Sequence, residues 1–252
     1  MKFFLPLILI SFCAQAFVVL IDPGHGGEEL GALTRVWVKK NGVKQTVNVY
    51  EKDLALRLAK SVKSKLEKKH TTYLTRSIDR TVTLNERANM AETVKADLFI
   101  SIHLNSATEN QYSGFETYYL DNHADKAIEK VENVENKYLL GAEKVVNQIL
   151  IDLVIQKTVP SSKKLANFVH GEVLKKVEKK FRMKDRGIKP GLFYVLALSK
   201  RPGVLIEAGF MSNPKELKKL QSKKFIENYA QAIATGIDKY LETLPPKDIP
   251  LF

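Results

Sequence analysis

The sequence predicts a single α/β domain, in which helices cover both faces of a mostly parallel sheet. Short apolar segments rich in β-branched residues alternate along the chain with longer segments whose apolar residues recur at helical spacing. The 252 residues suit one large domain, and neither an internal repeat nor a low-complexity linker divides them. The domain is expected to span residues 17–242, between an N-terminal segment, 1–16, and a proline-rich tail, 243–252.

The first elements of the domain are a strand and a hairpin. Residues 17–22 form a β-rich run that stops at a Pro-Gly pair, which predicts a buried strand. Segments 35–39 and 43–50 alternate polar and apolar residues on either side of Asn41-Gly42. Asn-Gly is a strong signal for a two-residue turn, so these two segments are predicted to pair as a β-hairpin.

Helices and strands alternate after the hairpin. From Glu51 onwards, leucine, valine and alanine recur every three or four residues, which predicts an amphipathic helix. Residues 71–75 are a predicted strand. Thr83, with Glu86 three positions later, has the pattern of a capping box and predicts a helix over 83–95. Two strongly apolar strands are expected next, at 97–102 and 114–120.

The remaining predicted elements have less regular sequence patterns. A long stretch rich in Glu, Lys and Asn covers residues 124–156, and the pattern after it favours a helix over 161–181. Pro214 is suited to the first position of a short helix. The other predicted elements are strands at 192–196 and 204–206 and an amphipathic helix at 225–241.

The N-terminus has the pattern of a cleaved secretory signal. Lys2 precedes an apolar run, 3–13, and Ala14-Gln15-Ala16 is a small-x-small cleavage site. The run is shorter than the roughly 20 residues that span a bilayer, and Pro6 interrupts it. We therefore expect cleavage after Ala16, a periplasmic or extracellular location and no permanent membrane anchor. The alternative is a retained anchor or a core strand.

The chain is strongly basic. Forty Lys and Arg residues against 28 Asp and Glu residues give a formal net charge of +12. Most of the lysines fall on the polar faces of predicted helices, where they are ordinary solvated residues. The functional alternative is attraction to an anionic polymer or a membrane surface. No nucleic-acid-binding module accompanies the charge, so nucleic acid is not an expected partner.

The single cysteine excludes a disulfide framework, and we expect a monomer.

Two histidines and two glutamates stand at related places in the predicted fold. His25 lies in the glycine-rich turn after the first strand, and Glu51 begins the helix after the hairpin. His103 ends the strand LFISIH and Glu207 ends the strand VLIE. The carboxyl ends of parallel strands line one crevice, so at least three of these residues are expected to converge. Two imidazoles and one carboxylate form a zinc ligand set with a fourth position open for water, and a second carboxylate can accept that water's proton.

Taken singly, each of these residues has a plain structural explanation. A lone histidine after a strand is more often a hydrogen-bonded structural residue, and Glu51 could simply interact with the dipole of its helix. Glu207 could be the partner of a buried cation, although burial would also raise its pKa and suit it to proton transfer. The other histidines lie in polar or helix-surface contexts and are predicted to be structural: His70, His123 and His170.

Several strings, taken in order along the chain, resemble one known family: VLIDPGHGG, VYEKDLALRLA, TLNERANMA, DLFISIHLNS, GFETYYL, DRGIK and PGVLIEAGFMSNPKE. They are similar to the zinc-dependent N-acetylmuramoyl-L-alanine amidases of the Amidase_3 family, the bacterial cell-separation amidases. The match covers about residues 17–242. It implies a single α/β domain with a central six-stranded sheet, in agreement with the pattern of elements above.

By this resemblance, His25, Glu51 and His103 would be the ligands of one Zn²⁺ ion, and Glu207 would be the catalytic carboxylate. All four positions carry the expected residue types, which argues against a degenerate, non-catalytic relative. The implied reaction is hydrolysis of the amide bond between N-acetylmuramic acid and L-alanine in peptidoglycan, for cell-wall turnover or daughter-cell separation.

Three further residues of the motif set have less specific roles. Asn105, just beyond His103, could orient the substrate or a group behind the ligands, and a turn-capping role is equally compatible with its position. Arg76 and Arg87 are expected to form structural ion pairs.

The stretch between Leu120 and Ser161 is longer than a minimal member of the family needs. In the cell-division amidases that the chain resembles, an inserted helix here can plug the zinc cleft until an activator protein displaces it. The segment 124–141 carries Glu132 and Glu135, either of which could reach the open position of the metal. A plug is one hypothesis for this segment. A solvated surface helix is the other, and the short length of the insertion favours it.

Two other functions fit parts of the pattern. A zinc peptidase that cleaves within the stem peptide would use the same ligands, and product analysis would separate it from an amidase. A non-catalytic wall-binding or activator protein on this fold would be expected to lack a ligand, and none is missing. A serine hydrolase is excluded, because no Gly-x-Ser-x-Gly motif accompanies the histidines.

Without a separate wall-targeting domain, localisation at the wall would depend on the catalytic domain, its charge or a partner.

Overall fold

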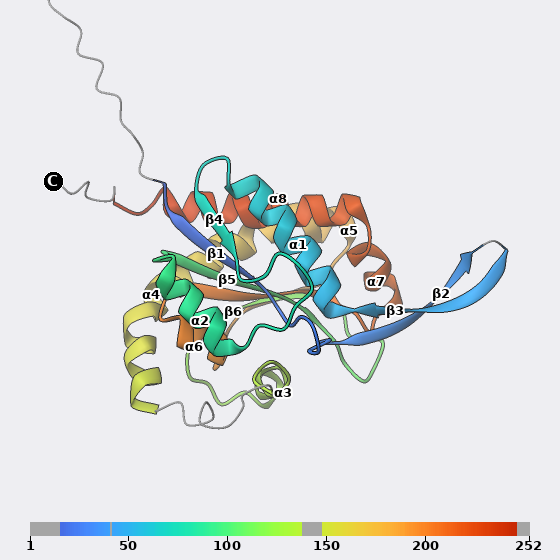
Figure 1. Cartoon of the computed structure of the whole chain (residues 1–252), viewed down its shortest axis with the longest axis horizontal. Helices are drawn as coiled ribbons and strands as arrows, with labels where there is room; N and C mark the ends of the chain where they lie inside the picture. The colour runs from blue at the N-terminus through green and yellow to red at the C-terminus, as the bar shows by residue number, and fades with distance from the viewer. Residues whose placement is uncertain (1–15, 41, 138–147, 246–252) are drawn as a thin grey trace, which may run out of the picture.

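A six-stranded sheet between two layers of helices is the centre of the fold in the computed structural model, which describes residues 16–40, 42–137 and 148–245 (Figure 1). The predicted signal segment, apart from its last residue, and most of the predicted tail lie outside the described residues. Among the helices of the described ranges, none combines the length and the apolar character needed to cross a membrane.

The sheet has the strand order β4-β1-β5-β8-β6-β7. The first four strands in this order are mutually parallel, β6 is antiparallel to β8, and β7 is parallel to β6. This confirms the predicted mostly parallel sheet. Its central strands are buried along almost their whole length, as expected for apolar runs that are covered on both faces. The strand bounds are β1 Val18–Pro23, β4 Thr71–Leu74, β5 Leu98–Asn105, β6 Phe115–Leu120, β7 Asp185–Gly191 and β8 Gly203–Phe210.

Two hydrophobic clusters fix the helices to opposite faces of the sheet. One cluster joins the sheet to α1, α8 and the second half of α4, and the other joins it to α2, α6 and the first half of α4. Figure 1 shows α1 and α8 on one side of the strands and α2 and α6 on the other. The helix bounds are α1 Glu51–Leu66, α2 Leu84–Thr93, α3 Lys126–Glu135, α4 Gln148–Val173, α5 Lys179–Phe181, α6 Tyr194–Ser199, α7 Pro214–Leu220 and α8 Lys223–Leu241, with a π-helical turn Leu174–Glu178 between α4 and α5.

The predicted hairpin is confirmed and forms a separate two-stranded sheet. β2 (Leu33–Lys40) pairs antiparallel with β3 (Val43–Tyr50), and Lys40 lies opposite Val43 across the turn. Figure 1 shows the hairpin extending from the body of the domain as an arm. The capping box of Thr83 and Glu86 at the start of α2 is likewise confirmed.

The predicted strand at 192–196 is wrong. The strand of this region is β7, Asp185–Gly191, and the apolar run that follows it forms α6. A short apolar run does not distinguish a strand from a buried helix by its periodicity. The true strand carries Pro190, which would be excluded from a central strand but is accepted in β7 because this strand lies at the edge of the sheet.

The predicted helix start at Ser161 is also wrong, because α4 begins at Gln148 and runs through Pro160. A proline inside a helix removes one hydrogen bond and usually marks a boundary. Here Pro160 is exposed, as is Gln156, whose carbonyl loses its helical donor and can bind water instead. Burial of Ile151 and Val154 anchors the first half of the helix to the sheet.

Two buried arginines hold the turn at the end of β1. Arg87 forms an ion pair with Asp22 and donates to the carbonyls of Pro23, at 3.0 Å, and His25, at 2.9 Å. Burial opposes ionisation of Asp22, but the charge of Arg87 and a hydrogen bond from Thr75 hold the pKa of Asp22 below its usual value. The predicted ion pair of Arg87 is therefore confirmed.

Arg76 behaves differently from the prediction. Its guanidinium donates to the carbonyls of Pro23, Gly24 and Lys52, at 3.1, 2.7 and 2.8 Å, rather than to a carboxylate. Burial lowers the pKa of Arg76 to about 10. Both arginines thus fix the backbone that carries His25.

We expect Arg87→Met to lower the free energy of unfolding by about 3–5 kcal/mol, because it leaves the buried Asp22 carboxylate without its cation. The measurement is urea unfolding in the presence of a metal chelator. Arg201→Met is the matched control: it removes a pair with Glu92, whose side chain is 76% exposed, and should cost less than about 1 kcal/mol. Equal losses in the two variants would contradict this role for Arg87.

Candidate metal centre

The turn after β1 places His25 over the carboxyl end of the sheet. His25 has a φ of +57°, a conformation that is uncommon for a residue with a side chain. Gly24 is required beside it, because a Cβ there would lie 2.3 Å from the ring of His103. The strained backbone and the close approach bring the two imidazoles together, with their ring centroids 4.9 Å apart.

Glu51 is held by the backbone of two other segments. Its Oε2 accepts from the amide of Ala32 at 2.8 Å, and its Oε1 accepts from the amide of Leu104 at 3.0 Å. The side chain is only 1% exposed. Gly31 adopts a φ of +64°, and a Cβ at this position would lie 2.6 Å from Oε2 of Glu51. A larger residue at Gly31 would therefore displace the carboxylate.

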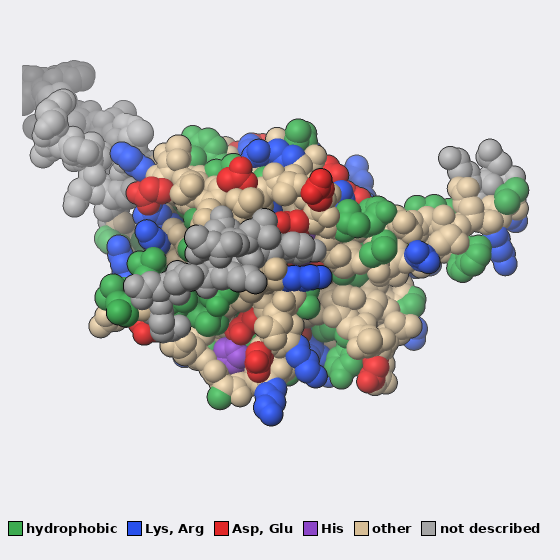
Figure 2. Space-filling model, turned by 60° about the horizontal axis from the view of Figure 1, so that its bottom comes forward, with side chains coloured by type: hydrophobic (Ala, Val, Ile, Leu, Met, Phe, Trp, Pro, Cys, Tyr) green, Lys and Arg blue, Asp and Glu red, His purple; other side chains and the backbone are tan. Residues whose placement is uncertain are grey.

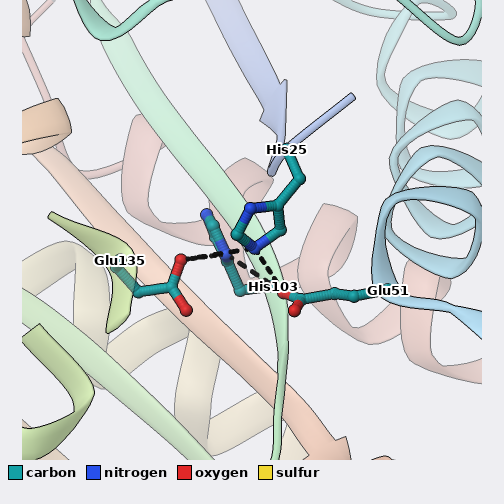
Figure 3. Close-up of side chains that lie close together, drawn as sticks. All are labelled: His25, Glu51, His103 and Glu135. Carbon is teal, nitrogen blue, oxygen red and sulfur yellow. Dashed lines mark hydrogen bonds and ion pairs between the residues drawn. The ribbon is translucent and has the colours of Figure 1, made fainter. Parts of the chain in front are cut away.

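Four side chains converge on one point at this end of the sheet. His25, Glu51, His103 and Glu135 each offer one ligand atom, and these atoms all lie within 4.8 Å of one another. Figure 3 shows Glu51 and Glu135 approaching the two imidazoles from opposite sides. The structure therefore brings together the three predicted metal ligands and adds Glu135 to them.

The geometry of the group fits zinc. His25 Nε2 lies 3.1 Å from Glu51 Oε1 and 3.5 Å from Glu135 Oε2. His103 Nδ1 lies 3.2 Å from the same Glu51 oxygen and 2.7 Å from the same Glu135 oxygen. Ligands at 2.0–2.1 Å around a tetrahedral ion are separated from one another by roughly 3.3 Å. Two imidazoles and two carboxylates are also a ligand set that zinc accepts.

Glu135 comes from α3, which is fixed over the centre by specific contacts. Asn136, just after the helix, exchanges hydrogen bonds with the carbonyl of Leu192 and the amide of Tyr194, both at 2.9 Å. Glu132 bonds to His123 at 2.6 Å and to the amide of Leu192. Of the two glutamates named from the sequence, Glu135 reaches the metal-ligand group and Glu132 instead anchors the helix.

Glu207 lies beside the group on the neighbouring strand. It is in register with His103 on β5 and with Glu116 on β6, so the three side chains lie on the same face of the sheet. Glu207 is 1% exposed, and neither of its carboxylate oxygens has a hydrogen-bond partner within the described residues. An unpartnered buried carboxyl is unusual, and such groups are often functional.

The two glutamates of this row have opposite environments. Burial, and then the negative charge of Glu135, raise the pKa of Glu207 well above its usual value, as expected from the sequence. Burial also opposes ionisation of Glu116, but hydrogen bonds from Lys189 and Tyr118, together with the charges of Lys189 and Arg186, lower its pKa. Glu207 is therefore suited to hold a proton, and Glu116 to remain charged.

The imidazoles are also perturbed. Burial alone would lower the pKa of His103, but the charges of Glu135 and Glu51 outweigh it and raise this pKa well above its usual value. The pKa of His25 is raised for the same reason, chiefly by Glu51. The pKa of Glu51 is in turn lowered by the two imidazoles, against the effect of its burial.

A cavity of about 480 Å³ opens beside three of the four side chains, His25, Glu51 and Glu135. One wall is α3, with Lys130 and Val134, and the other includes Asn105 and Ser106, which follow His103. The structure thus places Asn105 on the wall of the cavity rather than in the ligand group. Glu116 and its cations were not predicted from the sequence, although the string GFETYYL contains a charged residue in a largely apolar strand.

The remaining histidines lie away from the centre and have acidic or hydroxyl partners. His70 contacts Asp238 at 3.1 Å, His123 contacts Glu132 at 2.6 Å, and His170 contacts Thr117 at 2.9 Å.

The centre itself, with buried imidazole and carboxylate ligands beside an unpaired carboxyl, has the composition of a metal-dependent hydrolase site on an α/β fold.

Comparison with known proteins identifies the family. The profile described as N-acetylmuramoyl-L-alanine amidase, Amidase_3, matches residues 19–239. The chain is 33% identical over 233 residues to the N-acetylmuramoyl-L-alanine amidase AmiA of Escherichia coli K12, and the alignment covers 88% of this chain and 75% of that protein. The chain belongs to the Amidase_3 family of N-acetylmuramoyl-L-alanine amidases, which confirms the resemblance seen in its motifs.

Solved structures agree with this assignment. An N-acetylmuramoyl-L-alanine amidase from Clostridium difficile 630 superposes with a TM-score of 0.65 at 29% identity, covering 91% of this chain and 99% of that one. The CwlD amidase from Clostridioides difficile, solved in complex with the GerS lipoprotein, gives a TM-score of 0.65 at 25% identity and covers 90% and 100%.

We expect His25→Ala and His103→Ala to weaken zinc binding by at least about 100-fold, because each removes a buried ligand. Glu135→Ala should weaken it by less than about tenfold, since three ligands remain. Zinc content after gel filtration, and the zinc-dependent rise in Tm, would measure the effect. His70→Ala is the matched control and should bind zinc like the parent. Stoichiometric zinc in His103→Ala would contradict the site.

Proposed function

We propose that this chain is an exported, zinc-dependent enzyme that hydrolyses the amide bond between N-acetylmuramic acid and L-alanine in peptidoglycan. Membership of the amidase family supports the bond that is cleaved. The observation that carries the mechanism is the position of Glu207, in register with His103 and buried without a partner beside three metal-ligand candidates. Export rests on the signal pattern of residues 1–16.

His25, Glu51 and His103 are the three groups that would hold the zinc ion. When bound, zinc would supply a Lewis acid for the substrate carbonyl and lower the pKa of a water molecule toward 7. The backbone amides of Ala32 and Leu104 fix Glu51, and the glycines of the turn leave space for the rings. The protein thus presents a preformed ligand set whose geometry needs little rearrangement during the reaction.

Glu207 is the group proposed to move the proton. Its carboxylate accepts a proton from the attacking water and donates it to the nitrogen of the departing alanine, as the scissile C–N bond breaks. A raised pKa brings this carboxyl close to the operating pH, where proton acceptance and donation are both efficient. Asn105 lines the cavity, which supports a role for its side chain in hydrogen-bonding the substrate.

We expect Glu207→Gln to keep its fold and its zinc but to lose activity on purified sacculi by about 100- to 10,000-fold, the usual contribution of a general acid–base. Glu172→Gln is the matched control, because Glu172 is also buried but pairs with Lys239 at 2.8 Å. Mass spectrometry of the products supplies the readout. An amidase releases intact peptides that begin with L-alanine and leaves the glycan strands whole.

Two results would argue against this mechanism. Full turnover by the Glu207→Gln variant would assign the proton transfer to another group. Products cleaved within the stem peptide would instead identify the zinc peptidase considered from the sequence.

We further propose that α3 is an autoinhibitory helix. Glu135 occupies the side of the group opposite Glu51, where a fourth ligand would exclude the attacking water. An activating partner would have to break the contacts of Glu132 and Asn136 with Leu192 and Tyr194. The CwlD amidase was solved with a lipoprotein partner, which supports the idea that this chain also has a partner protein. The last part of the predicted plug, 138–141, lies outside the described residues.

We expect Glu135→Ala to raise the initial rate on sacculi by about fivefold or more, which is the lower end of typical coupling energies. The zinc-loaded variants are compared at equal metal content. Glu129→Ala is the control, because Glu129 lies exposed on the same helix. An unchanged or lower rate in a folded Glu135 variant would favour the alternative of an ordinary surface helix.

A further inference from the structure

The β2–β3 hairpin has one face that is unusually exposed for its composition. Along β2, the side chains alternate between exposed and half-buried, and the exposed set includes a tryptophan, Trp37, which is 75% exposed. A solvated tryptophan in the middle of a strand contributes little to stability, and such residues are enriched at binding surfaces. We call the exposed set the hairpin face; it consists of Arg35, Trp37, Lys39, Lys44, Thr46 and Asn48.

The side chains of the hairpin face surround an open hollow of about 530 Å³. It is lined by Arg35, Trp37, Thr46 and Asn48, which combine one aromatic ring, one cation and two hydrogen-bonding groups. An aromatic ring flanked by amide and hydroxyl groups suits a sugar, which presents a C–H face for stacking and hydroxyl groups around its edge. Figure 2 shows hydrophobic and basic side chains together on this arm.

The charge of the hairpin is also one-sided. Residues 33–50 contain four Lys and Arg residues and no Asp or Glu. On the hairpin face, Lys39 lies directly opposite Lys44 across the strands, an arrangement in which like charges repel. Within the described residues, no carboxylate forms an ion pair with either lysine. A ligand that carries carboxylates would relieve this repulsion.

The base of the hairpin is continuous with the metal centre. Gly31 and Ala32, which precede β2, line the 480 Å³ cavity, and β3 leads directly into Glu51. The hydroxyl of Thr34 donates to the carbonyl of Met211 at 3.1 Å, and Val49 is buried. Trp37 lies opposite Thr46, about 16 Å of extended chain from Glu51. A ligand that contacts both Trp37 and the metal centre must therefore be a polymer.

We propose that the hairpin face binds the glycan strand and the carboxylate-bearing peptides of peptidoglycan at a distance from the bond that is cleaved. Trp37 stacks on a sugar ring, Thr46 and Asn48 bond to its substituents, and Lys39 and Lys44 pair with carboxylates of the stem peptides. This inference rests on the proposed function, because it identifies how the same substrate is held. An anionic membrane is the less favoured ligand, since three of the four residues that line the hollow are polar or charged: Arg35, Thr46 and Asn48.

The first test measures binding without cleavage. The full chain with Glu207→Gln is sedimented with purified sacculi, with and without Trp37→Ala. We expect Trp37→Ala to raise the Kd by about tenfold. Tyr73→Ala is the matched control, because Tyr73 is 45% exposed on β4 at the far edge of the sheet and should bind like the parent. Unchanged binding in Trp37→Ala, or no binding by the parent, would overturn the proposal.

A second test addresses the charges and the alternative ligand. The double variant Lys39→Gln/Lys44→Gln should bind sacculi more weakly at low salt, and the difference should shrink as salt screens exposed charges. Lys68→Gln/Lys164→Gln removes the same charge from two exposed positions outside the hairpin and should have no such effect. If Trp37→Ala instead weakens sedimentation with phosphatidylglycerol vesicles and not with sacculi, the hairpin face is a membrane surface and the proposal is wrong.

Kinetics with Glu207 intact separate this inference from the proposed function. Trp37→Ala should reduce cleavage of sacculi by about tenfold more than cleavage of a soluble muramoyl-peptide, which is too short to reach the hairpin. Equal losses on the two substrates would contradict a remote binding site. If the zinc-loaded Glu135→Ala variant, in which the proposed autoinhibition is removed, cleaves neither substrate while the parent binds sacculi through Trp37, the proposed reaction fails and the binding site stands.

Discussion

One buried carboxylate joins the three segments that form the metal centre. Oε1 of Glu51 lies 3.1 Å from the ring nitrogen of His25 and 3.2 Å from that of His103, while Oε2 accepts from the amide of Ala32. A buried carboxylate that loses its partners costs several kcal/mol, so these contacts constrain one another. The turn after β1, the end of β5 and the start of α1 therefore have one stable arrangement. The close approaches at Gly24 and Gly31 follow from this arrangement.

The second constraint is the row of polar side chains across the centre of the sheet. Glu207 and Glu116 face each other on adjacent strands, yet of the two only Glu116 forms ion pairs within the described residues, with Arg186 and Lys189. Placing two carboxylates side by side is tolerable when one of them is neutral. The cations keep the pKa of Glu116 low, and burial keeps that of Glu207 high. Such a separation of two pKa values is how proteins obtain a proton donor and a fixed charge from the same residue type.

Contacts between residues far apart in the chain also explain which features could not be predicted from the sequence. The Asn-Gly turn, the capping box and the helix after Glu51 are local patterns, and the structure confirms all three. The strand β7 was not predicted, because its sequence is compatible with a strand only at the edge of a sheet. The choice between Glu132 and Glu135 was equally inaccessible, because residues three apart lie on the same face of a helix. The contacts of Glu132 with His123 and with the amide of Leu192 decide which of the two glutamates faces the metal-ligand group.

The charges of the pocket explain why so many ionisable groups can share one buried space. The carboxylates of Glu51 and Glu135 raise the pKa values of His25 and His103, which favours imidazolium charges opposite these carboxylates, and burial raises the pKa of Glu207, which favours its neutral form. A divalent cation carries the same charge as the two imidazole protons that it would displace. Without Glu135, the charge of such a cation would be balanced by Glu51 and an ionised Glu207, which could then accept the proton of the attacking water. The negative charge that develops on the carbonyl oxygen in amide hydrolysis would replace the charge that Glu207 loses on accepting the proton, so the pocket would stay balanced in the transition state.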